Sequence, residues 1–229
     1  MIKTFEEIKS YNIVLFQPKN GYRYNEDSFY VINFIKNIKK DANIIELCAG
    51  VGVIGLCLLK KFSQIQTLTF VELQKPICEI LIENIKINGL SQKTKVINSD
   101  YRKINKKLFT SFDVVVANPP YRKLNTGRIS KDFLKAKSRH ELEGSLQEFI
   151  EISSKLLKDK GKLYFIFLAE RLNEILSNMT KYFIEPKIIQ FIHPKKNLES
   201  KLVLIEGVKK GKSGIKILPP LFIDEYKIL

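Results

Sequence analysis

The segment that decides the fold of this chain is Asn43-Ile44-Ile45-Glu46-Leu47-Cys48-Ala49-Gly50-Val51-Gly52, where an apolar run leads into a glycine-containing turn. We predict a buried strand over residues 43–48 and a helix over residues 53–62. In an open parallel sheet, ligands bind at the carboxyl ends of the strands, and glycines there let the backbone approach a ligand that faces a helix N-terminus. The segment therefore predicts a ligand-binding turn after the first strand of a parallel sheet.

Apolar runs and helical patterns alternate along the chain that follows this turn. The sequence predicts further strands over residues 67–72, 95–98, 112–117 and 162–168, and helices over residues 76–88, 146–157 and 171–181. An antiparallel edge is predicted from residues 187–192 and 201–208, with residues 215–218 as a short further strand. Before the turn we expect an extended opening, a turn at residues 19–22 and a helix over residues 27–38. This alternation indicates an α/β fold with a mostly parallel sheet covered on both faces.

Length and composition limit the class of protein. The chain has 229 residues, of which 45% are hydrophobic and 28% charged, and this composition supports one packed domain. No apolar stretch approaches the roughly 20 residues that cross a bilayer, and residues 1–12 lack a signal-peptide core, so we expect a cytoplasmic protein. The three cysteines show no CxxC or Cys/His spacing, so we expect neither a disulfide framework nor a metal site.

A second feature stands at the predicted end of the next strand, where Glu72 follows the turn by about twenty residues. An acidic residue there can accept hydrogen bonds from both hydroxyls of a ribose, so the two features together favour a nucleoside ligand. Gly50, Gly52 and Gly55 also form a weak match to the dinucleotide-binding pattern, so the turn alone leaves NAD open. The simplest alternative is a tight turn that only packs a helix on a strand.

A rigid loop, Asn118-Pro119-Pro120-Tyr121, follows the apolar run of residues 114–117. Its two prolines fix the backbone and remove two N–H donors. The exocyclic amine of a base is a poor nucleophile because its lone pair is delocalised. The Asn118 oxygen and the Pro119 carbonyl could accept both amine hydrogens and aim the lone pair at an electrophile, while Tyr121 stacks on the base. The loop therefore predicts a catalytic amine site, and a plain Asn-Pro turn is the alternative.

Together these features resemble the S-adenosylmethionine-dependent amino-methyltransferases of the Rossmann-like class I fold, with a seven-stranded, mostly parallel sheet and an antiparallel C-terminal edge hairpin. More closely, the chain resembles the bacterial tRNA1(Val) (adenine-37-N6)-methyltransferase family. The further segments that carry this resemblance are residues 16–24 with Asp27, 138–142, 193–194, 203–208 and 219–221. The resemblance implies one methyltransferase domain over residues 41–229, with residues 1–40 packing over the cofactor site.

The resemblance also implies S-adenosylmethionine as cofactor and assigns the site residues. The turn with Glu46 would hold the methionine moiety, Glu72 the ribose hydroxyls and Asp100 the adenine amine. The full set of expected cofactor contacts is Glu46, Cys48, Gly50, Gly52, Glu72, Leu73, Asp100, Tyr101, Arg23 and Asp27. The expected catalytic residues are Asn118, Pro119, Pro120 and Tyr121, and no metal is implied. Cys48 departs from the glycine that the family usually has at this position.

The chain is strongly basic, and its charge is uneven. It carries 39 Lys and Arg against 24 Asp and Glu, a formal net charge of +15, and residues 102–139 and 187–216 account for the whole excess. Such a field attracts a polyanion, and arginine forks suit phosphate, although a merely solvated lysine-rich surface is the alternative. We predict a protein that binds tRNA and no membrane, with RNA contacts from Arg122, Lys123, Arg128, Arg139, Lys195 and Lys196. A monomer is favoured, and the oligomeric state stays open.

The predicted function is methylation of the N6 amine of an adenine in RNA, with adenine 37 in a tRNA anticodon loop as the target. A protein glutamine-N5 methyltransferase shares the Asn-Pro-Pro-Tyr loop, but that family has a helical recognition domain before the glycine turn, and only 45 residues precede Glu46 here. A DNA adenine methyltransferase would need a large recognition domain. An RNA-binding module that keeps the cofactor fold without turnover stays a further alternative, since a fold does not prove activity.

Overall fold

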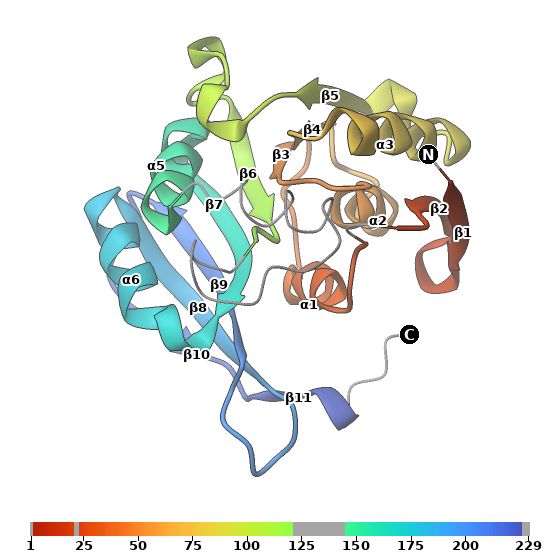
Figure 1. Ribbon diagram of the computed structural model, residues 1–229. Helices are drawn as coiled ribbons and strands as arrows, with labels where there is room; N and C mark the ends of the chain where they lie inside the picture. The colour runs from red at the N-terminus through yellow and green to blue at the C-terminus, as the bar shows by residue number, and fades with distance from the viewer. Residues whose placement is uncertain (1, 21–22, 121–144, 226–229) are drawn as a thin grey trace.

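The computed structural model describes residues 2–20, 23–120 and 145–225, and a sheet between two layers of helices forms its centre (Figure 1). The described strands of this sheet run in the spatial order β10-β8-β9-β7-β6-β3-β4-β5, and β11 also pairs with β8. Their bounds are β3 Asn43–Leu47, β4 Thr67–Glu72, β5 Thr94–Asn98, β6 Phe112–Ala117, β7 Leu157–Leu168, β8 Ile184–His193, β9 Leu202–Lys209, β10 Lys216–Ile217 and β11 Leu221–Phe222. β9 runs antiparallel to β7 and β8, whereas the other described pairs are parallel. The predicted fold class is confirmed.

Helices cover both faces of the sheet because its central strands are apolar on both sides. All six residues of β6 are buried, and Val114 and Val115 enter different apolar clusters on opposite faces. The helices of the first layer are α1 (Asp27–Phe34), α2 (Val53–Lys61) and α3 (Lys75–Ile87), and those of the second are α5 (Leu146–Leu156) and α6 (Leu172–Lys181). Across the described ranges, no helix has the length and apolar character needed to cross a membrane.

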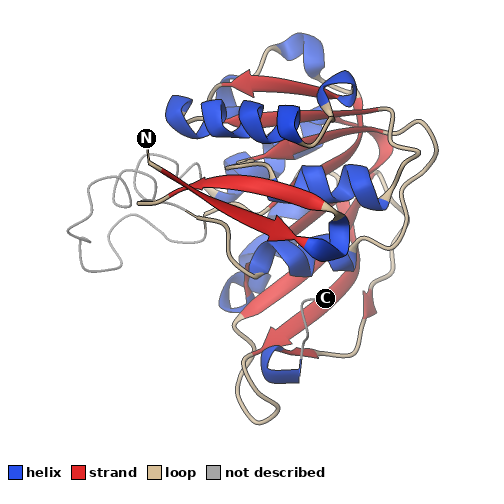
Figure 2. Cartoon of the chain, turned by 90° about the vertical axis from the view of Figure 1, so that its right-hand side faces the viewer, coloured by secondary structure: helices blue, strands red, loops and turns tan. Residues whose placement is uncertain are grey.

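The opening of the chain forms a hairpin that is separate from the main sheet (Figure 2). β1 (Lys3–Ile8) pairs antiparallel with β2 (Ile13–Pro18). The sequence predicted an extended opening but not this pairing. Apolar and polar residues alternate only weakly along each strand, and both strands lie within one short segment, so the pattern did not indicate two paired strands. The hairpin therefore adds a second, two-stranded sheet to the predicted fold.

Side-chain hydrogen bonds of Asn84 on α3 connect the hairpin to the rest of the molecule. Its side chain is fully buried, and its Oδ1 accepts the Phe16 N–H at 2.7 Å. Its Nδ2 donates to the carbonyls of Phe16 and Val51, each at 3.0 Å. One helical turn later, Asn88 repeats the pattern with the N–H and C=O of Val14, at 3.0 and 2.7 Å. One amide side chain thus joins β2 to the turn that follows β3.

Three elements differ in length from the predictions by several residues, and one of them is β8, which spans Ile184–His193 instead of residues 187–192. The helix predicted over residues 27–38 ends at Phe34, and Lys61 of α2 donates its Nζ to the carbonyls of Ile32 and Ile35 at 2.6 and 2.9 Å, which satisfies carbonyls at this helix end. β7 begins at Leu157 instead of residue 162, and its register with β6 shifts near Phe112. The charged start of β7 lacks the apolar signal of a strand, so only pairing with β6 reveals it.

Replacing Asn84 with alanine tests the attachment of the hairpin. The variant loses the partners of three backbone groups, the buried Val51 carbonyl and the part-buried N–H and carbonyl of Phe16, and such a loss costs about 1–3 kcal/mol for a buried group. We expect the free energy of unfolding, measured by urea denaturation, to fall by roughly 3 kcal/mol or more. The control Lys86→Ala changes an exposed position on the same helix and should stay within about 0.5 kcal/mol of the wild type. Equal stability of the two variants would contradict the role of Asn84.

Candidate active site

The central parallel strands end at one edge of the sheet. β3 lies between β4 and β6, so Leu47 is opposite both Val71 and Ala117, and β5 places Asn98 opposite Glu72. The β6 arrow points to this edge (Figure 1). The predicted site segments that leave these strands at this edge are residues 48–52, 72–73, 100–101 and 118–120. Four segments that are far apart in the sequence therefore start from the same edge.

The turn after β3 has an unusual backbone. Cys48, Gly50 and Gly52 have φ values of 56°, 55° and 88°, in the left-handed region that favours glycine. Cys48 thus carries a side chain at a glycine-type position, which costs about 1 kcal/mol or somewhat more. Burial raises the pKa of its thiol, so the thiol is neutral at physiological pH. A Cβ at Gly52 would lie 2.4 Å from Leu81 Cδ1, so this glycine is needed for space as well as for conformation.

Glu72 ends β4, and its carboxylate is held against the turn. Oε2 accepts the Gly50 N–H and Oε1 accepts the Gln74 N–H, each at 2.8 Å. On the neighbouring strand, Asn98 Nδ2 donates to the carbonyls of Glu72 and Leu73 at 2.8 and 3.0 Å. Burial raises the pKa of Glu72 although these backbone N–H groups lower it. The two bonds use about half of the acceptor capacity of a carboxylate and fix its orientation.

Glu46 lies beneath the turn. Only 1% of the residue is exposed, and its Oε2 accepts the Gly55 N–H at 2.8 Å. A Cβ on Gly55 would meet Phe70 Cε1 at 2.5 Å and Glu46 Oε2 at 2.6 Å, so this glycine lets α2 pack closely on the sheet. Burial raises the pKa of Glu46 to about 8 against the opposing effect of the Gly55 bond. Glu46 is therefore largely protonated at neutral pH.

Asp100 and Tyr101 follow β5 but face different neighbours. Asp100 Oδ1 accepts the Arg102 N–H at 2.9 Å, and its carboxylate also binds the Arg102 guanidinium, with Nη2 2.6 Å from Oδ2. These bonds hold the pKa of Asp100 below its usual range. Tyr101 is buried under α5, where its ring packs edge-on against Phe149 with centroids 6.4 Å apart. The structure therefore brings Asp100 to the edge together with a guanidinium, and it places Tyr101 in the core.

Asn118, Pro119 and Pro120 leave β6 beside the first turn of α1. Asn118 Nδ2 donates to the Oγ of Ser28 at 3.4 Å, and Ser28 is buried. Asp27, which begins α1, accepts from Asn25 Nδ2 at 2.7 Å. Because the amide nitrogen of Asn118 is directed at Ser28, the carbonyl end of the amide points away from it. The structure thus joins the predicted catalytic loop to the opening segment of the chain.

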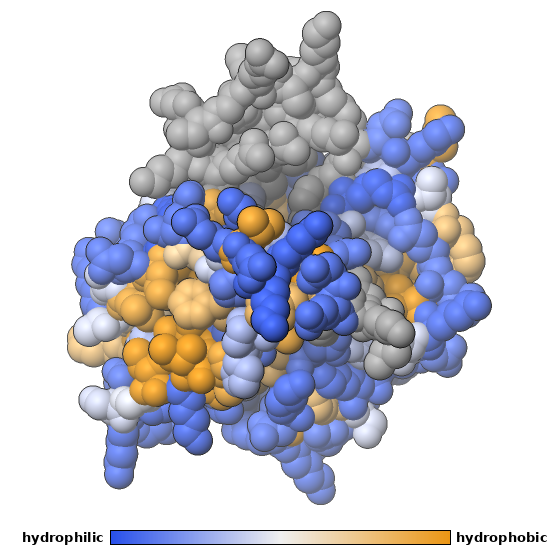
Figure 3. All heavy atoms as spheres, turned by 90° about the horizontal axis from the view of Figure 1, so that it is seen from below, coloured by the Kyte–Doolittle hydropathy of each residue, from blue (hydrophilic) through white to orange (hydrophobic). Residues whose placement is uncertain are grey.

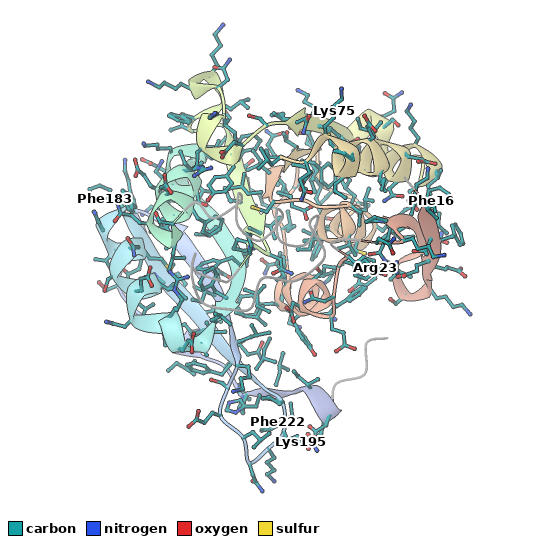
Figure 4. The ribbon with its side chains drawn as sticks, viewed as in Figure 1. Phe16, Arg23, Lys75, Phe183, Lys195 and Phe222 are labelled. Carbon is teal, nitrogen blue, oxygen red and sulfur yellow. The ribbon has the colours of Figure 1, made fainter. Side chains whose placement is uncertain are left out.

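Arg23 interacts with the hairpin (Figure 4). Its guanidinium donates to Thr4 Oγ1 at 2.7 Å and pairs with Glu6. Tyr24 also donates its hydroxyl to Glu6, at 2.8 Å, and its ring packs on the apolar cluster that contains Val51 of the turn. Arg23 is therefore fixed next to residues that contact the turn, and its own bonds in this structure go to Thr4 and Glu6 of β1 and to the Pro18 carbonyl of β2.

The predicted RNA contacts fall into two groups. Lys195 and Lys196 are exposed in the loop after β8, and this loop lies at the carboxyl edge because β8 runs in the same direction as β7. His193 Nδ1 lies 2.7 Å from the carbonyl of Leu198 across the loop. Seen from below, much of this side is hydrophilic, with the largest apolar area on the left of the view and smaller ones elsewhere (Figure 3). The other predicted RNA contacts lie outside the described ranges, and they are Arg122, Lys123, Arg128 and Arg139. The predicted catalytic residue Tyr121 also lies outside these ranges.

Sequence reasoning missed the residues that support the site. Asn84 and Asn98 orient the turn and the end of β4, Ser28 contacts Asn118, and Arg102 binds Asp100. Asn84 did give a signal, since it lies four residues before Asn88 on a helix face that is otherwise apolar. The contacts of Asn98 and Ser28 depend on which elements are neighbours in space, so the adjacent sequence could not reveal them. Asp100 and Arg102 are only two residues apart, and this spacing was a signal for their ion pair.

The burial of Glu46 predicts a pH-dependent stability. Its pKa is about 8 in the folded chain and 4.5 in the reference state, so between these values the folded protein keeps a proton that the unfolded chain releases. Stability is therefore lost as the pH rises, by at most roughly 1.4 kcal/mol per pH unit. We expect Glu46→Gln, which keeps an oxygen for the Gly55 N–H, to flatten this decline in urea titrations from about pH 5 to 8. The exposed-position control Glu79→Gln should keep the wild-type slope, and an unchanged slope in Glu46→Gln would refute the assignment.

The model of one protein family, the methyltransferase small domain, matches residues 28–190 of this chain. That span begins in α1 and ends within β8. It contains the turn after β3, Glu72 and Asn118, which the sheet brings to one edge.

The curated relatives share only a low sequence identity with this chain. The tRNA1(Val) (adenine(37)-N6)-methyltransferase of Actinobacillus pleuropneumoniae serotype 5b is 22% identical over 148 residues, which cover 64% of this chain and 60% of the relative. A protein of the same name from Trichodesmium erythraeum is 27% identical over 173 residues, covering 73% of this chain and 70% of the relative. The chain thus spans about 60% of the length of the first relative.

Solved structures share the fold. A predicted O-methyltransferase of Agrobacterium tumefaciens superposes with a TM-score of 0.68 at 17% identity, covering 86% of this chain and 87% of that protein. TYW2 of M. jannaschii, solved in complex with AdoMet, gives a TM-score of 0.62 at 18% identity, covering 90% and 85%. The sheet order, the converging strand ends and the family match over most of the sequence lead to one conclusion: this chain belongs to the methyltransferase small domain family.

Proposed function

We propose that this chain transfers the methyl group of S-adenosylmethionine to the exocyclic N6 amine of an adenine in RNA, with adenine 37 in the anticodon loop of a tRNA as the target. The observation that carries the proposal is the position of Asn118, Pro119 and Pro120 at the end of β6, next to the strand that leads into the glycine turn. Acceptors beside a cofactor turn suit an amine substrate. The printed name of the two curated relatives supports tRNA as the substrate class.

The donors and acceptors at this edge fit S-adenosylmethionine. Glu72, preset by the Gly50 and Gln74 N–H groups, has acceptor capacity for both ribose hydroxyls. Asp100 would accept from the adenine amine with oxygens that also bind Arg102, and the half-buried Leu73 would face the ring. When bound, the cofactor supplies an electrophilic methyl group on a positively charged sulfur.

The turn and the hairpin would enclose the methionine moiety. The left-handed residues of the turn, supported from below by Glu46, would present their backbone to it. Residues 1–40 would pack over the cofactor, since Tyr24 contacts the cluster around Val51 and Asn84 binds both β2 and the turn. Arg23 and Asp27 are the predicted contacts from this segment.

Asn118 would orient the target amine. The Asn118 amide oxygen would accept one amine hydrogen, and the Pro119 carbonyl would accept the other. The two acceptors favour a pyramidal nitrogen with a localised lone pair. A bond forms from this nitrogen to the methyl carbon as the carbon–sulfur bond breaks, and the proton that has become acidic passes to water. Tyr121 is predicted to stack on the base.

Phosphates of the RNA would bind a basic rim around this edge. Lys195 and Lys196 are exposed there, on the loop after β8. The sequence also predicts Arg122, Lys123, Arg128 and Arg139 as phosphate contacts, because their segment brackets the catalytic loop. Such contacts position the RNA, and the amine loop selects the base.

Replacing Asn118 with alanine tests the amine site. The variant loses the acceptor that orients the amine, so we expect the rate of methyl transfer to unmodified tRNA to fall by about 100-fold or more. S-adenosylmethionine affinity, measured by calorimetry, should change little. The control Asn37→Ala removes the side chain of an exposed asparagine after α1 and should keep the wild-type rate.

Mass-spectrometric mapping of the product identifies the target. Wild-type protein should yield N6-methyladenosine at a single position of the anticodon loop. Methylation confined to a glutamine of a protein substrate, with no label in any RNA, would overturn the proposed substrate. An Asn118→Ala variant with the wild-type rate would remove this residue from the mechanism.

Replacing Glu72 with glutamine tests the cofactor site. Glutamine keeps the shape of the side chain but loses the charge that strengthens the bonds to the ribose hydroxyls, so we expect S-adenosylmethionine to bind roughly 10-fold or more weakly. Calorimetric titration measures the affinity, and the control is again Glu79→Gln on α3. Unchanged affinity in a folded Glu72→Gln protein would exclude a ribose contact.

A further inference from the structure

Three non-glycine residues with left-handed backbone meet at a corner far from the methyl-transfer edge. Lys160 in β7, Phe183 after α6 and Lys210 after β9 have φ values of 63°, 59° and 50°. The Lys210 N–H donates to the Phe183 carbonyl at 2.7 Å, and Lys160 Nζ donates to the Lys210 carbonyl. Hydrogen bonds therefore connect three segments of this corner that are distant in the sequence.

Of these three residues, Phe183 has the backbone conformation and side-chain exposure that the stability of the fold explains least. It comes directly after the C-cap of α6, where a left-handed residue is usually glycine. A bulky side chain is costly in this conformation, and the side chain gains no burial in return, since the residue is 71% exposed. Its bond to Lys210 uses only its backbone carbonyl. The aromatic ring is thus held in solvent on a fixed backbone.

Exposed lysines lie on the segments that meet at this corner. Lys181 ends α6 two residues before Phe183, and Lys160 and Lys210 belong to the corner itself. Lys212 follows Lys210 and is also exposed. Asp159 pairs with Lys210 at 2.8 Å, and Glu151 lies close enough to Lys181 for that lysine to lower the pKa of Glu151, so two carboxylates offset part of this charge. We call Lys160, Lys181, Phe183, Lys210 and Lys212 the Phe183 corner, which combines one rigid aromatic ring with a basic surface.

We propose that the Phe183 corner is a second RNA-binding surface, on which Phe183 stacks against an accessible base and the lysines contact phosphates. An aromatic ring among cations is the combination that binds nucleic acid without reading its sequence. A membrane surface would call for several neighbouring apolar side chains, whereas among the residues named for this corner only Phe183 is a large exposed apolar one.

The corner would contact a part of the RNA that is distant from the methylated base. Phe183 and Lys195 flank opposite ends of β8 (Figure 4), and a ten-residue strand spans about 33 Å. This inference rests on the proposed function, because it needs an RNA substrate. It adds a contact whose loss weakens RNA binding without touching the chemistry of methyl transfer.

The test is Phe183→Gly, with Phe183→Asn as a second variant, because both residues tolerate a left-handed backbone. We expect the affinity for full-length unmodified tRNA to fall about five-fold or more, since each base stacked on an aromatic residue contributes strongly to binding. The melting temperature and S-adenosylmethionine affinity should stay near the wild-type values. The control Phe5→Ala removes a ring that is 60% exposed on β1 and should leave tRNA affinity unchanged.

A lysine pair tests the electrostatic part. The double variant Lys160→Gln, Lys210→Gln should reduce the slope of log affinity against log salt by roughly one to two. The double variant Lys9→Gln, Lys86→Gln removes the same charge from exposed positions elsewhere and should keep the wild-type slope. Because net charge is matched, a difference between the two pairs reports local contact with phosphate.

The outcomes separate this inference from the proposed function. If the wild type methylates tRNA but the Phe183 variants and the Lys160, Lys210 pair bind it like the wild type, the second surface is refuted and the proposed function stands. If the wild type labels no RNA, the proposed function fails first. If Phe183→Gly weakens binding to anionic lipid vesicles and not to tRNA, the corner is a membrane surface and the RNA assignment is overturned.

Discussion

The hydrogen bond from the Gly50 N–H to the Glu72 carboxylate is the contact around which the rest of the edge is arranged. It ties the turn after β3 to the end of β4 and sets the direction of the carboxylate. It forms only because the turn has a left-handed backbone at Cys48, Gly50 and Gly52 and because β3 and β4 pair in parallel register. Shifting that register by one residue would turn Glu72 to the other face of the sheet.

The opening segment completes this edge through buried polar contacts. Asn84 joins β2 to the turn, and Ser28 at the start of α1 receives the Asn118 amide. The Asn84 amide satisfies backbone groups of the hairpin that would otherwise lose their hydrogen bonds to water without replacement. Because hydrogen bonds are directional, they hold the hairpin in one position. The same geometry shows how the segment before β3 is joined to this edge although the parallel sheet does not include it.

The basic charge of the chain is divided between the two ends of β8. Lys195 and Lys196 lie at the carboxyl edge, while the Phe183 corner lies before the strand begins. Many lysines elsewhere are engaged in structure: Lys61 binds carbonyls near the end of α1, and Lys209 donates to the carbonyls of Ser154 and Leu157 near the end of α5. Net charge alone therefore overstates the surface that a polyanion can use, because some lysines bind backbone carbonyls or carboxylates, Lys160 and Lys210 of the Phe183 corner among them.

The sequence by itself determined the fold class, because buried parallel strands require continuous apolar runs and helices between them. It also placed the glycine turn, Glu72 and the loop from Asn118 at strand ends, while their roles stay predictions. Only the tertiary structure decided that the opening forms a hairpin, that Tyr101 enters the core and that Glu46 is buried, which raises its pKa. The physical reason is that periodicity encodes which face of an element is buried, whereas polar partners and pKa values depend on which strands and helices become neighbours.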